Sequence, residues 1–187
     1  DVMLDKYYFG KVDRISPEAP VPIVNIQKEE SRLGGASNVA NNIVSLGGHS
    51  LLCGVIGHDL FGKEIERISR HKNIDTFLLK TSSPTITKAR IIGGKQQIVR
   101  VDYEDKSELN ADNKKLFRDT ISRILPEYDI LVISDYGKGL ISEDLCRYLI
   151  KLAHKYDKKV IIDPKGKNWE KYSGADIVTP NVKELSD

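Results

Sequence analysis

Three polar loops, each following a strand-like run, carry the side chains with the clearest chemical potential. They are Ser134-Asp135-Tyr136-Gly137-Lys138-Gly139, Asp163-Pro164-Lys165-Gly166 and Thr179-Pro180-Asn181-Val182-Lys183-Glu184. In parallel α/β sheets, ligands bind outside the carboxyl ends of the strands, where such loops gather. Each loop alone is compatible with an ordinary turn, but three in succession at one sheet edge predict a binding site for a small anionic molecule.

A pair of glycines, Gly34 and Gly35, precedes a segment with helical periodicity that begins Ala36-Ser37-Asn38. Glycines at this point let a ligand approach the backbone, and the start of a helix offers unpaired N–H groups. The amide of Asn38 can both donate to and accept from a hydroxyl group. The pattern is compatible with a ligand-binding turn and equally with an ordinary glycine turn between a strand and a helix.

Charged residues in two further segments suit a phosphorylated ligand. Asp1 and Asp5 flank Val-Met-Leu, which predicts a strand end bearing carboxylates, with two solvated turn aspartates as the alternative. Lys88 and Arg90 alternate along a predicted strand and so share one face, with Arg100 across a hairpin. These cations suit an anionic group such as a sugar phosphate, although a charged outer face is an equally good interpretation.

Composition and spacing argue against several classes of protein. The 187 residues carry 29 Lys and Arg against 27 Asp and Glu, and this net charge of +2 is too balanced for a nucleic-acid binder. No apolar run approaches the roughly 20 residues that span a bilayer, and no signal peptide is visible, so we expect a cytoplasmic protein without membrane contact. Cys53 and Cys146 form no CxxC motif, and the four histidines lack metal-ligand spacing.

Nucleotide-binding motifs of the common kinds are missing. The segment from Gly57 to Lys63 matches GxxxxGK, but Glu64 stands where a phosphate loop needs Ser or Thr for magnesium, which favours a turn into a helix. No GxGxxG occurs, so a dinucleotide-dependent oxidoreductase has no support.

The segments that position these residues predict an α/β fold. Strands are expected at Val21–Ile26, Leu51–Ile56, Thr85–Ile92, Gln97–Tyr103, Ile130–Ser134, Lys159–Asp163 and Asp176–Thr179. Helices are expected at Ala36–Leu46 and Phe61–His71, from an Asp112 cap to Leu125, and from a Ser142 cap to Tyr156. The apolar strands of the second half predict a parallel sheet covered by helices. The alternating strands of the first half predict a small β flap, in which a hairpin has Val21–Ile26 as a companion strand.

Taken together, the motifs resemble the ribokinase-like (PfkB) carbohydrate kinases. The closest resemblance is to the D-glycero-β-D-manno-heptose 7-phosphate kinases, including the N-terminal kinase domain of bifunctional heptose kinase/adenylyltransferases. The segments Pro-Glu-Ala-Pro-Val-Pro and Asp-Tyr-Gly-Lys-Gly point to this heptose branch, whereas the glycine pair and Asn-x-x-Glu mark only the superfamily. The implied fold is a Rossmann-like core of mostly parallel strands flanked by helices, with a small β-sheet lid, about residues 12–33 and 84–103, that mediates homodimerisation.

The resemblance implies ATP-dependent phosphorylation of heptose 7-phosphate at its anomeric hydroxyl. The product would be the 1,7-bisphosphate, for ADP-heptose and lipopolysaccharide core synthesis, with ATP and Mg²⁺ as cofactors. By similarity, the residues at the sugar would be Asp5, Gly34, Gly35, Asn38, Asp135 and Lys138, and those at its phosphate Lys88, Arg90 and Arg100. The residues toward the nucleotide would be Lys165, Asn181, Val182, Lys183 and Glu184, with Glu184 serving the magnesium indirectly.

One motif of the family is missing from the sequence. The catalytic base of these kinases lies in a Gly-Ala-Gly-Asp segment, which does not occur in the 187 residues. Both ends also fall within patterned stretches, so we expect an incomplete kinase domain with no kinase activity by itself. Two alternatives stay open: another ribokinase-like phosphosugar kinase, and a non-catalytic module for sugar-phosphate binding or dimerisation.

Overall fold

The computed structural model describes residues 1–186 and separates into two compact units. One unit is Val2–Glu104, and the other consists of residues 105–186 together with Asp1. Each unit combines strands and helices, as the sequence predicts for an α/β protein. Within the described residues, no helix has the length and apolar character needed to span a membrane.

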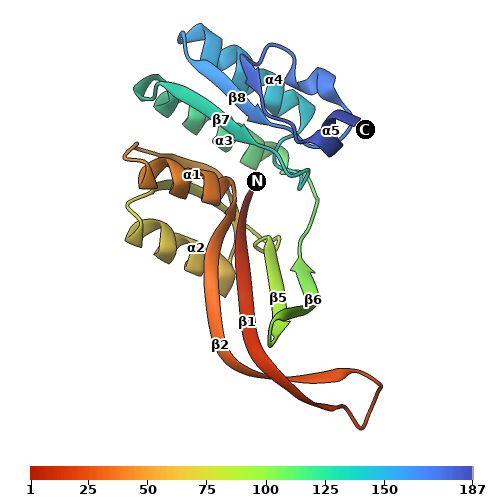
Figure 1. The fold of residues 1–187 in the computed structure, drawn as a ribbon. Coiled ribbons are helices and arrows are strands. Elements are labelled where there is room, and N and C mark those ends of the chain that lie inside the picture. Colours follow the sequence, from red (N-terminus) through yellow and green to blue (C-terminus); the bar gives the residue numbers. More distant parts are fainter. Residues whose placement is uncertain (187) are drawn as a thin grey trace. The chain divides into compact units, whose positions relative to one another are not determined.

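A four-stranded sheet dominates the Val2–Glu104 unit (Figure 1). Its strands, in spatial order, are β2 (Pro22–Gly35), β1 (Val2–Ile15), β5 (Thr87–Gly93) and β6 (Gln96–Tyr103). β1 runs antiparallel to β2 and parallel to β5, while β5 and β6 form the predicted antiparallel hairpin. Gly94 lies in the hairpin turn with a φ of 63°, a backbone conformation that glycine adopts without steric cost.

β1 and β2 form a long, bent two-stranded ribbon (Figure 1). Their register shifts between Phe9 and Gly10 and again between Val12 and Arg14, and such bulges bend and twist a strand pair. A Cβ atom added to Gly10 would lie 2.4 Å from the carbonyl oxygen of Asn25. Glycine at this position therefore lets the two backbones approach each other where the ribbon bends.

Two helices and a pair of parallel strands complete this unit. They are α1 (Ala36–Ser45), β3 (Leu51–Gly57), α2 (Leu60–His71) and β4 (Asp75–Thr81). They pack with the ends of β1 and β2 around one hydrophobic core, which contains Val2, Leu4, Leu33, Ala40, Leu52, Ile56, Ile65 and Ile74. This core fixes the first residues of β1 and the last residues of β2, the positions that carry Asp5 and the glycine pair.

The segment with phosphate-loop spacing is a helix cap. Asp59 precedes α2, and its carboxylate accepts hydrogen bonds from the backbone N–H of Gly62 and from both the N–H and the hydroxyl of Thr85, all at 2.8 Å. Although burial favours the neutral acid, these hydrogen bonds lower the pKa of Asp59. A carboxylate thus occupies the start of the helix, which agrees with the predicted turn into a helix.

The second unit is a three-stranded parallel sheet with helices. Its strands, in spatial order, are β7 (Ile130–Ser134), β8 (Lys159–Asp163) and β9 (Ile177–Val178). Its helices are α3 (Ala111–Ile124), α4 (Glu143–Lys155) and the short α5 (Val182–Ser186), with 3₁₀ turns at Leu125–Glu127 and Trp169–Tyr172. The predicted β-α-β arrangement, followed by a further strand, is confirmed.

The caps of the two long helices differ in how well the sequence predicts them. Ser142 caps α4 as expected, and its hydroxyl accepts a hydrogen bond from the N–H of Leu145. The predicted Asp112 cap of α3 is wrong, because Asn110 has the extended backbone of an N-cap and its side chain accepts from the N–H of Asn113 at 2.8 Å. Asp112 lies instead in the first turn, where a carboxylate also interacts favourably with the helix dipole.

The first half of the chain departs most from the prediction. β1 begins at Val2, so Asp5 lies inside a strand, and the predicted strand end between Asp1 and Asp5 is wrong. The companion strand extends from Pro22 to Gly35, and β1 separates it from the hairpin. β4 was not predicted at all. β2 carries the charged run from Lys28 to Arg32, which has low strand propensity, so pairing with β1 overrides the local preference.

Candidate functional site

Asp5 lies against the glycine pair that precedes α1. The register of β1 with β2 places Met3 opposite Gly34 and Asp5 opposite Arg32. A Cβ atom on Gly34 would lie 2.6 Å from Oδ2 of Asp5 and 2.9 Å from Cγ of Met3, so the Asp5 carboxylate fills the space that a side chain would need. Gly35 is the N-cap of α1 with a φ of 54°. The glycine pair therefore lies where a strand passes directly into a helix, without a separate turn, and a role in sugar binding remains a prediction.

Arg90 forms an ion pair with Asp5. Its Nη1 atom donates to Oδ1 of Asp5 at 2.6 Å, and both side chains are 21% exposed. The guanidinium carbon also lies 5.1 Å from the centre of the Tyr7 ring, within the range of a cation–π contact. The pair therefore presents a carboxylate, which can accept a hydroxyl proton in a hydrogen bond, beside a cation that can bind an anion.

Lys88 and Arg100 lie on the same face of the sheet as this pair. Asp5 is in register with Lys88 across β1 and β5, and Arg90 is directly opposite Arg100 across the hairpin. Because residues in register project to the same side of a sheet, the three predicted cations share one face. Two guanidinium nitrogens of Arg100 donate to the carboxylate of Asp102, each at 2.8 Å.

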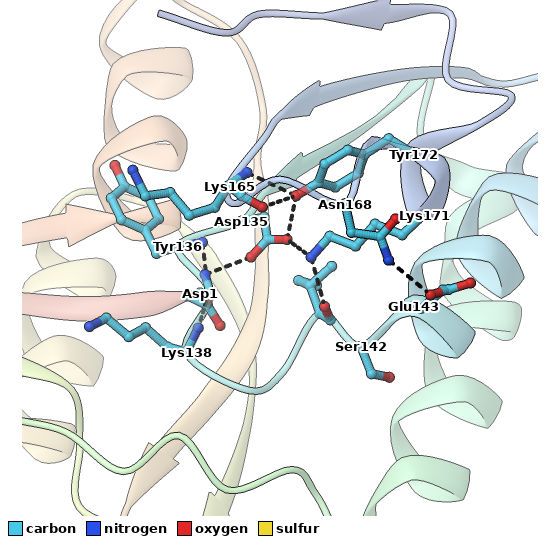
Figure 2. Close-up of polar contacts among 12 residues, drawn as sticks. Asp1, Asp135, Tyr136, Lys138, Ser142, Glu143, Lys165, Asn168, Lys171 and Tyr172 are labelled. Carbon is cyan, nitrogen blue, oxygen red and sulfur yellow. Dashed lines mark hydrogen bonds and ion pairs between the residues drawn. The ribbon is translucent and has the colours of Figure 1, made fainter. Parts of the chain in front are cut away.

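In the second unit, Asp135 is the centre of a buried polar cluster (Figure 2). Its side chain lies directly after β7 and the residue is 2% exposed. Oδ1 accepts from the N–H of Gly137 at 2.7 Å, and Oδ2 accepts from Nζ of Lys171 at 2.5 Å and from the Tyr172 hydroxyl at 2.7 Å. The cation and two hydrogen-bond donors compensate the buried carboxylate, as a charge in such a site requires.

Tyr172 joins Asp135 to the loop after β8. Besides donating to Asp135, its hydroxyl accepts from the backbone N–H of Lys165 at 2.8 Å. Burial raises the pKa of Tyr172, and the neighbouring Asp135 adds to this shift because a phenolate beside a carboxylate is unfavourable. The hydroxyl therefore keeps its proton and ties two of the three predicted loops together.

The carboxylate of Asp1 holds the loop that contains Lys138. Its Oδ2 accepts from the N–H of Tyr136 at 2.8 Å and from the N–H of Lys138 at 3.1 Å (Figure 2). Gly137 and Gly139 have φ angles of 63° and 101°, so the loop uses the left-handed region twice beside these contacts. The predicted Asp1 carboxylate thus serves as a loop anchor.

Lys165, Asn181 and Glu184 meet at the start of α5. Nζ of Lys165 lies 3.0 Å from Oε1 of Glu184, while Asn181 and Glu184 exchange side chain-to-backbone hydrogen bonds of 3.0 Å in a capping box. The hydrogen bond from the Asn181 backbone, together with Lys165, lowers the pKa of Glu184. Burial and the charge of Glu184 raise the pKa of the neighbouring Asp163. The predicted nucleotide residues are therefore grouped, with Val182 and Lys183 exposed beside them.

The remaining predictions concern Asn38 and metal ions. Asn38 is exposed on the first turn of α1, close in sequence to the glycine pair. Across residues 1–186, no cluster of three or more His, Cys, Asp or Glu side chains is arranged to hold a metal ion.

Sequence reasoning missed Lys171 and Tyr172. Both lie in the 3₁₀ turn before β9, in the segment Trp169–Tyr172, which carries no recognisable binding motif. The available signal in the sequence was an aspartate, Asp135, directly after an apolar strand. A carboxylate that is buried there requires a cationic or hydrogen-bonding partner elsewhere in the chain. The position of that partner, 36 residues further on, follows only from the fold.

Comparison with known proteins decides the family. The sequence pattern of the pfkB family of carbohydrate kinases matches residues 6–187. The chain belongs to this family. The predicted resemblance to PfkB carbohydrate kinases is therefore confirmed over nearly the whole sequence.

Curated members of the family include proteins with a second function. The chain is 46% identical over 187 residues to the bifunctional protein HldE of Helicobacter pylori (strain P12), a match that covers 99% of the chain and 41% of that protein. It is 44% identical over 186 residues to the bifunctional protein HldE of a Nitratiruptor species, with coverages of 100% and 39%. The chain thus spans about two fifths of the length of these relatives.

Solved structures share the fold. Phosphofructokinase-2 from Escherichia coli in complex with fructose-6-phosphate matches with a TM-score of 0.73 at 21% identity, covering 99% of this chain and 60% of that one. A putative phosphofructokinase from Staphylococcus aureus matches with a TM-score of 0.78 at 15% identity, covering 100% and 58%. At these identities the similarity concerns the fold alone, and it confirms the predicted ribokinase-like α/β class.

Proposed function

We propose that this chain provides the sugar-phosphate site of a kinase that transfers a phosphoryl group from ATP to the anomeric hydroxyl of D-glycero-β-D-manno-heptose 7-phosphate. The observation that carries the proposal is the Asp5–Arg90 pair, on one face of the sheet with Lys88 and Arg100. Asp5 supplies an acceptor for a sugar hydroxyl, and the three cations supply partners for a phosphate. Such a face suits a phosphorylated sugar better than a neutral one.

The physical logic is that of phosphoryl transfer in general. Two phosphorylated molecules must be brought together despite their charge, so the protein contributes mainly positioning and charge neutralisation. Guanidinium groups are suited to this task, because they stay protonated and bind phosphate oxygens through two parallel hydrogen bonds. The half-buried position of Arg90 strengthens its interaction with an anion compared with a fully solvated side chain.

The choice of heptose 7-phosphate rests on similarity rather than on geometry. The segments Pro-Glu-Ala-Pro-Val-Pro and Asp-Tyr-Gly-Lys-Gly resemble the heptose branch of the family, and the bifunctional HldE relatives are 44–46% identical.

The proposal includes the family's dimerisation through the β-sheet lid, residues about 12–33 and 84–103. Exposed apolar side chains on this sheet, among them Val12, Ile26 and Val99, are compatible with such an interface. Since the reaction consumes ATP, we place it in the cytoplasm.

ATP and Mg²⁺ are the cofactors of this proposal. Lys165 and the segment Asn181–Glu184 would face the nucleotide, and a magnesium ion would neutralise charge on the phosphates being transferred. The raised pKa of Asp163 reflects burial and the repulsion of the Glu184 carboxylate, a setting that a divalent cation relieves. With no cluster of three ligands in residues 1–186, these side chains fit an ion held mainly by phosphates and water.

Calorimetric titration of the chain with heptose 7-phosphate tests the proposal. Binding is the readout, because the proposal concerns the residues that hold the sugar phosphate. We expect Arg90→Gln and Arg100→Gln each to weaken binding by about 10- to 100-fold, since a hydrogen bond to a charged group contributes roughly 1.5–3 kcal/mol.

Arg123→Gln, on α3 in the other unit, is the matched control and should leave the affinity unchanged. Titration with fructose 6-phosphate distinguishes a heptose kinase from another phosphosugar kinase. Tighter binding of fructose 6-phosphate than of heptose 7-phosphate would favour the second alternative. Heptose 7-phosphate affinity that is indifferent to both arginine changes would refute the proposed site.

A further inference from the structure

Arg32 lies on the same face of the sheet as the proposed phosphate site. It is directly opposite Asp5 across β1 and β2, and Asp5 is in turn in register with Lys88. In the next row, Glu30, Tyr7, Arg90 and Arg100 are in register across all four strands. Arg32 therefore belongs to the same cationic face as Arg90, although it lies on the edge strand β2 and Arg90 on the interior strand β5.

Both guanidinium groups, of Arg32 and of Arg90, contact the ring of Tyr7. The guanidinium carbon of Arg32 lies 4.8 Å from the centre of the Tyr7 ring, and that of Arg90 lies 5.1 Å from the same point. Both distances are within the range of cation–π contacts. Tyr7 on β1 therefore contacts one guanidinium group from β2 and one from β5, the two strands that flank β1.

In the structure, each of these arginines forms an ion pair with a carboxylate, Arg32 with Glu30 and Arg90 with Asp5. Nη2 of Arg32 lies 2.6 Å from Oε2 of Glu30, whose other oxygen pairs with Lys28, and the Arg32 side chain is 59% exposed. An ion pair at such an exposed site contributes little stability, so another anion exchanges for it easily. Phosphate is a suitable competitor, because it offers two charged oxygens to one guanidinium.

We propose that Arg32 is a further phosphate-binding residue of the sugar-phosphate site, and that Glu30 holds it until the substrate's phosphate takes its place. This inference rests on the proposed function, since it concerns the same ligand. Tyr7 contacts both arginines, and in this proposal the phosphate is bound from β2 and from the β5–β6 hairpin. Arg90, once it binds phosphate, releases the Asp5 carboxylate for a sugar hydroxyl.

Calorimetric titration of Arg32→Gln with heptose 7-phosphate tests the role of Arg32. We expect affinity to fall about 5- to 20-fold, in line with the loss of one charge-assisted contact at an exposed position. Binding of the same heptose without its phosphate should stay unchanged, because Arg32 contacts only the phosphate in this proposal. Arg67→Gln is the matched control: Arg67 is also exposed and paired with a carboxylate, Glu64, but it lies on α2. It should leave both affinities unchanged.

Glu30→Gln tests the displacement. Removing the competing carboxylate should tighten heptose 7-phosphate binding about two- to fivefold, the range expected for an exposed ion pair. Weaker or equal binding would overturn this part of the inference.

The outcomes separate the inference from the proposed function. If Arg90→Gln weakens binding but Arg32→Gln does not, the phosphate site stands and the role of Arg32 is refuted. If the wild-type chain and all variants bind heptose 7-phosphate with one common affinity, the proposed function itself fails. If Arg32→Gln weakens binding of phosphorylated and unphosphorylated heptose equally, Arg32 acts through the fold and the inference is refuted.

Discussion

Asp135 illustrates how burial determines what a charged side chain can do. At 2% exposure, its two carboxylate oxygens are engaged by Lys171, Tyr172 and the N–H of Gly137. A hydrogen bond from a sugar hydroxyl to the Asp135 carboxylate, as the resemblance implies, would compete with these partners. The contacts favour a positioning role instead, in which Asp135 fixes the loop after β7 and, through Tyr172, the loop after β8.

Replacing Lys171 by Met should show how much the Lys171 cation stabilises the buried Asp135 carboxylate. The change leaves Asp135 without its cation, so we expect the free energy of unfolding to fall by about 3–5 kcal/mol, as for other buried pairs that lose one partner. Urea denaturation measures the loss. Lys151→Met, an exposed position on α4, is the control and should change stability by no more than about 0.5 kcal/mol. Equal stability of the two variants would contradict the assigned role of Lys171.

At the scale of elements, one carboxylate ties β9 to its neighbours. Asp176 precedes β9 and accepts from Nζ of Lys159 at 2.8 Å, from the N–H of Val160 at 2.9 Å and from the His154 ring at 3.2 Å. The hydrogen bond from Lys159, followed by that from Val160, holds the pKa of Asp176 well below its usual range. The strand is only two residues long, and this side chain adds its contacts with Lys159 and Val160 to the backbone pairing of β9 with β8.

The depressed pKa of Asp176 predicts how stability depends on pH. In the unfolded chain the carboxyl takes up a proton near the ordinary aspartate value of about 3.9, whereas in the folded chain it does so only at lower pH. The stabilisation is therefore complete above the unfolded pKa and is lost as pH falls through the folded pKa. We expect Asp176→Asn to flatten the fall of unfolding free energy below about pH 4, measured by urea titration at several pH values. Asp129→Asn, an exposed position before β7, should retain the wild-type slope, and an unchanged slope in Asp176→Asn would refute the linkage.

At the scale of the whole molecule, the sequence predicts the second unit much better than the first. The apolar runs of β7 and β8 and the amphipathic α4 carry strong local signals, and the structure confirms them. β1 and β2 depend on pairing between charged segments, which local propensity cannot show. The helix start after the glycine pair was predictable because Gly35 has a positive φ, which depends on one residue and its backbone.

The candidate sites show the same difference between local signals, which the sequence reveals, and long-range contacts, which it does not. Motifs pointed to Asp5, Arg90 and Asp135, but their partners were not predictable. Asp5 and Arg90 are 85 residues apart, and the Lys171 partner of Asp135 lies outside any motif. Contacts of such long range depend on strand register and burial, which exist only after the chain has folded.

The most direct test of the central claim compares two ligands on the wild-type chain. Calorimetric titrations with heptose 7-phosphate and with the same heptose lacking phosphate would be run at low and high salt. We expect the phosphorylated sugar to bind at least about tenfold more tightly at low salt, with the difference narrowing as salt screens the cationic face. Equal affinity for the two ligands at both salt concentrations would show that the face around Asp5 and Arg90 is not a sugar-phosphate site.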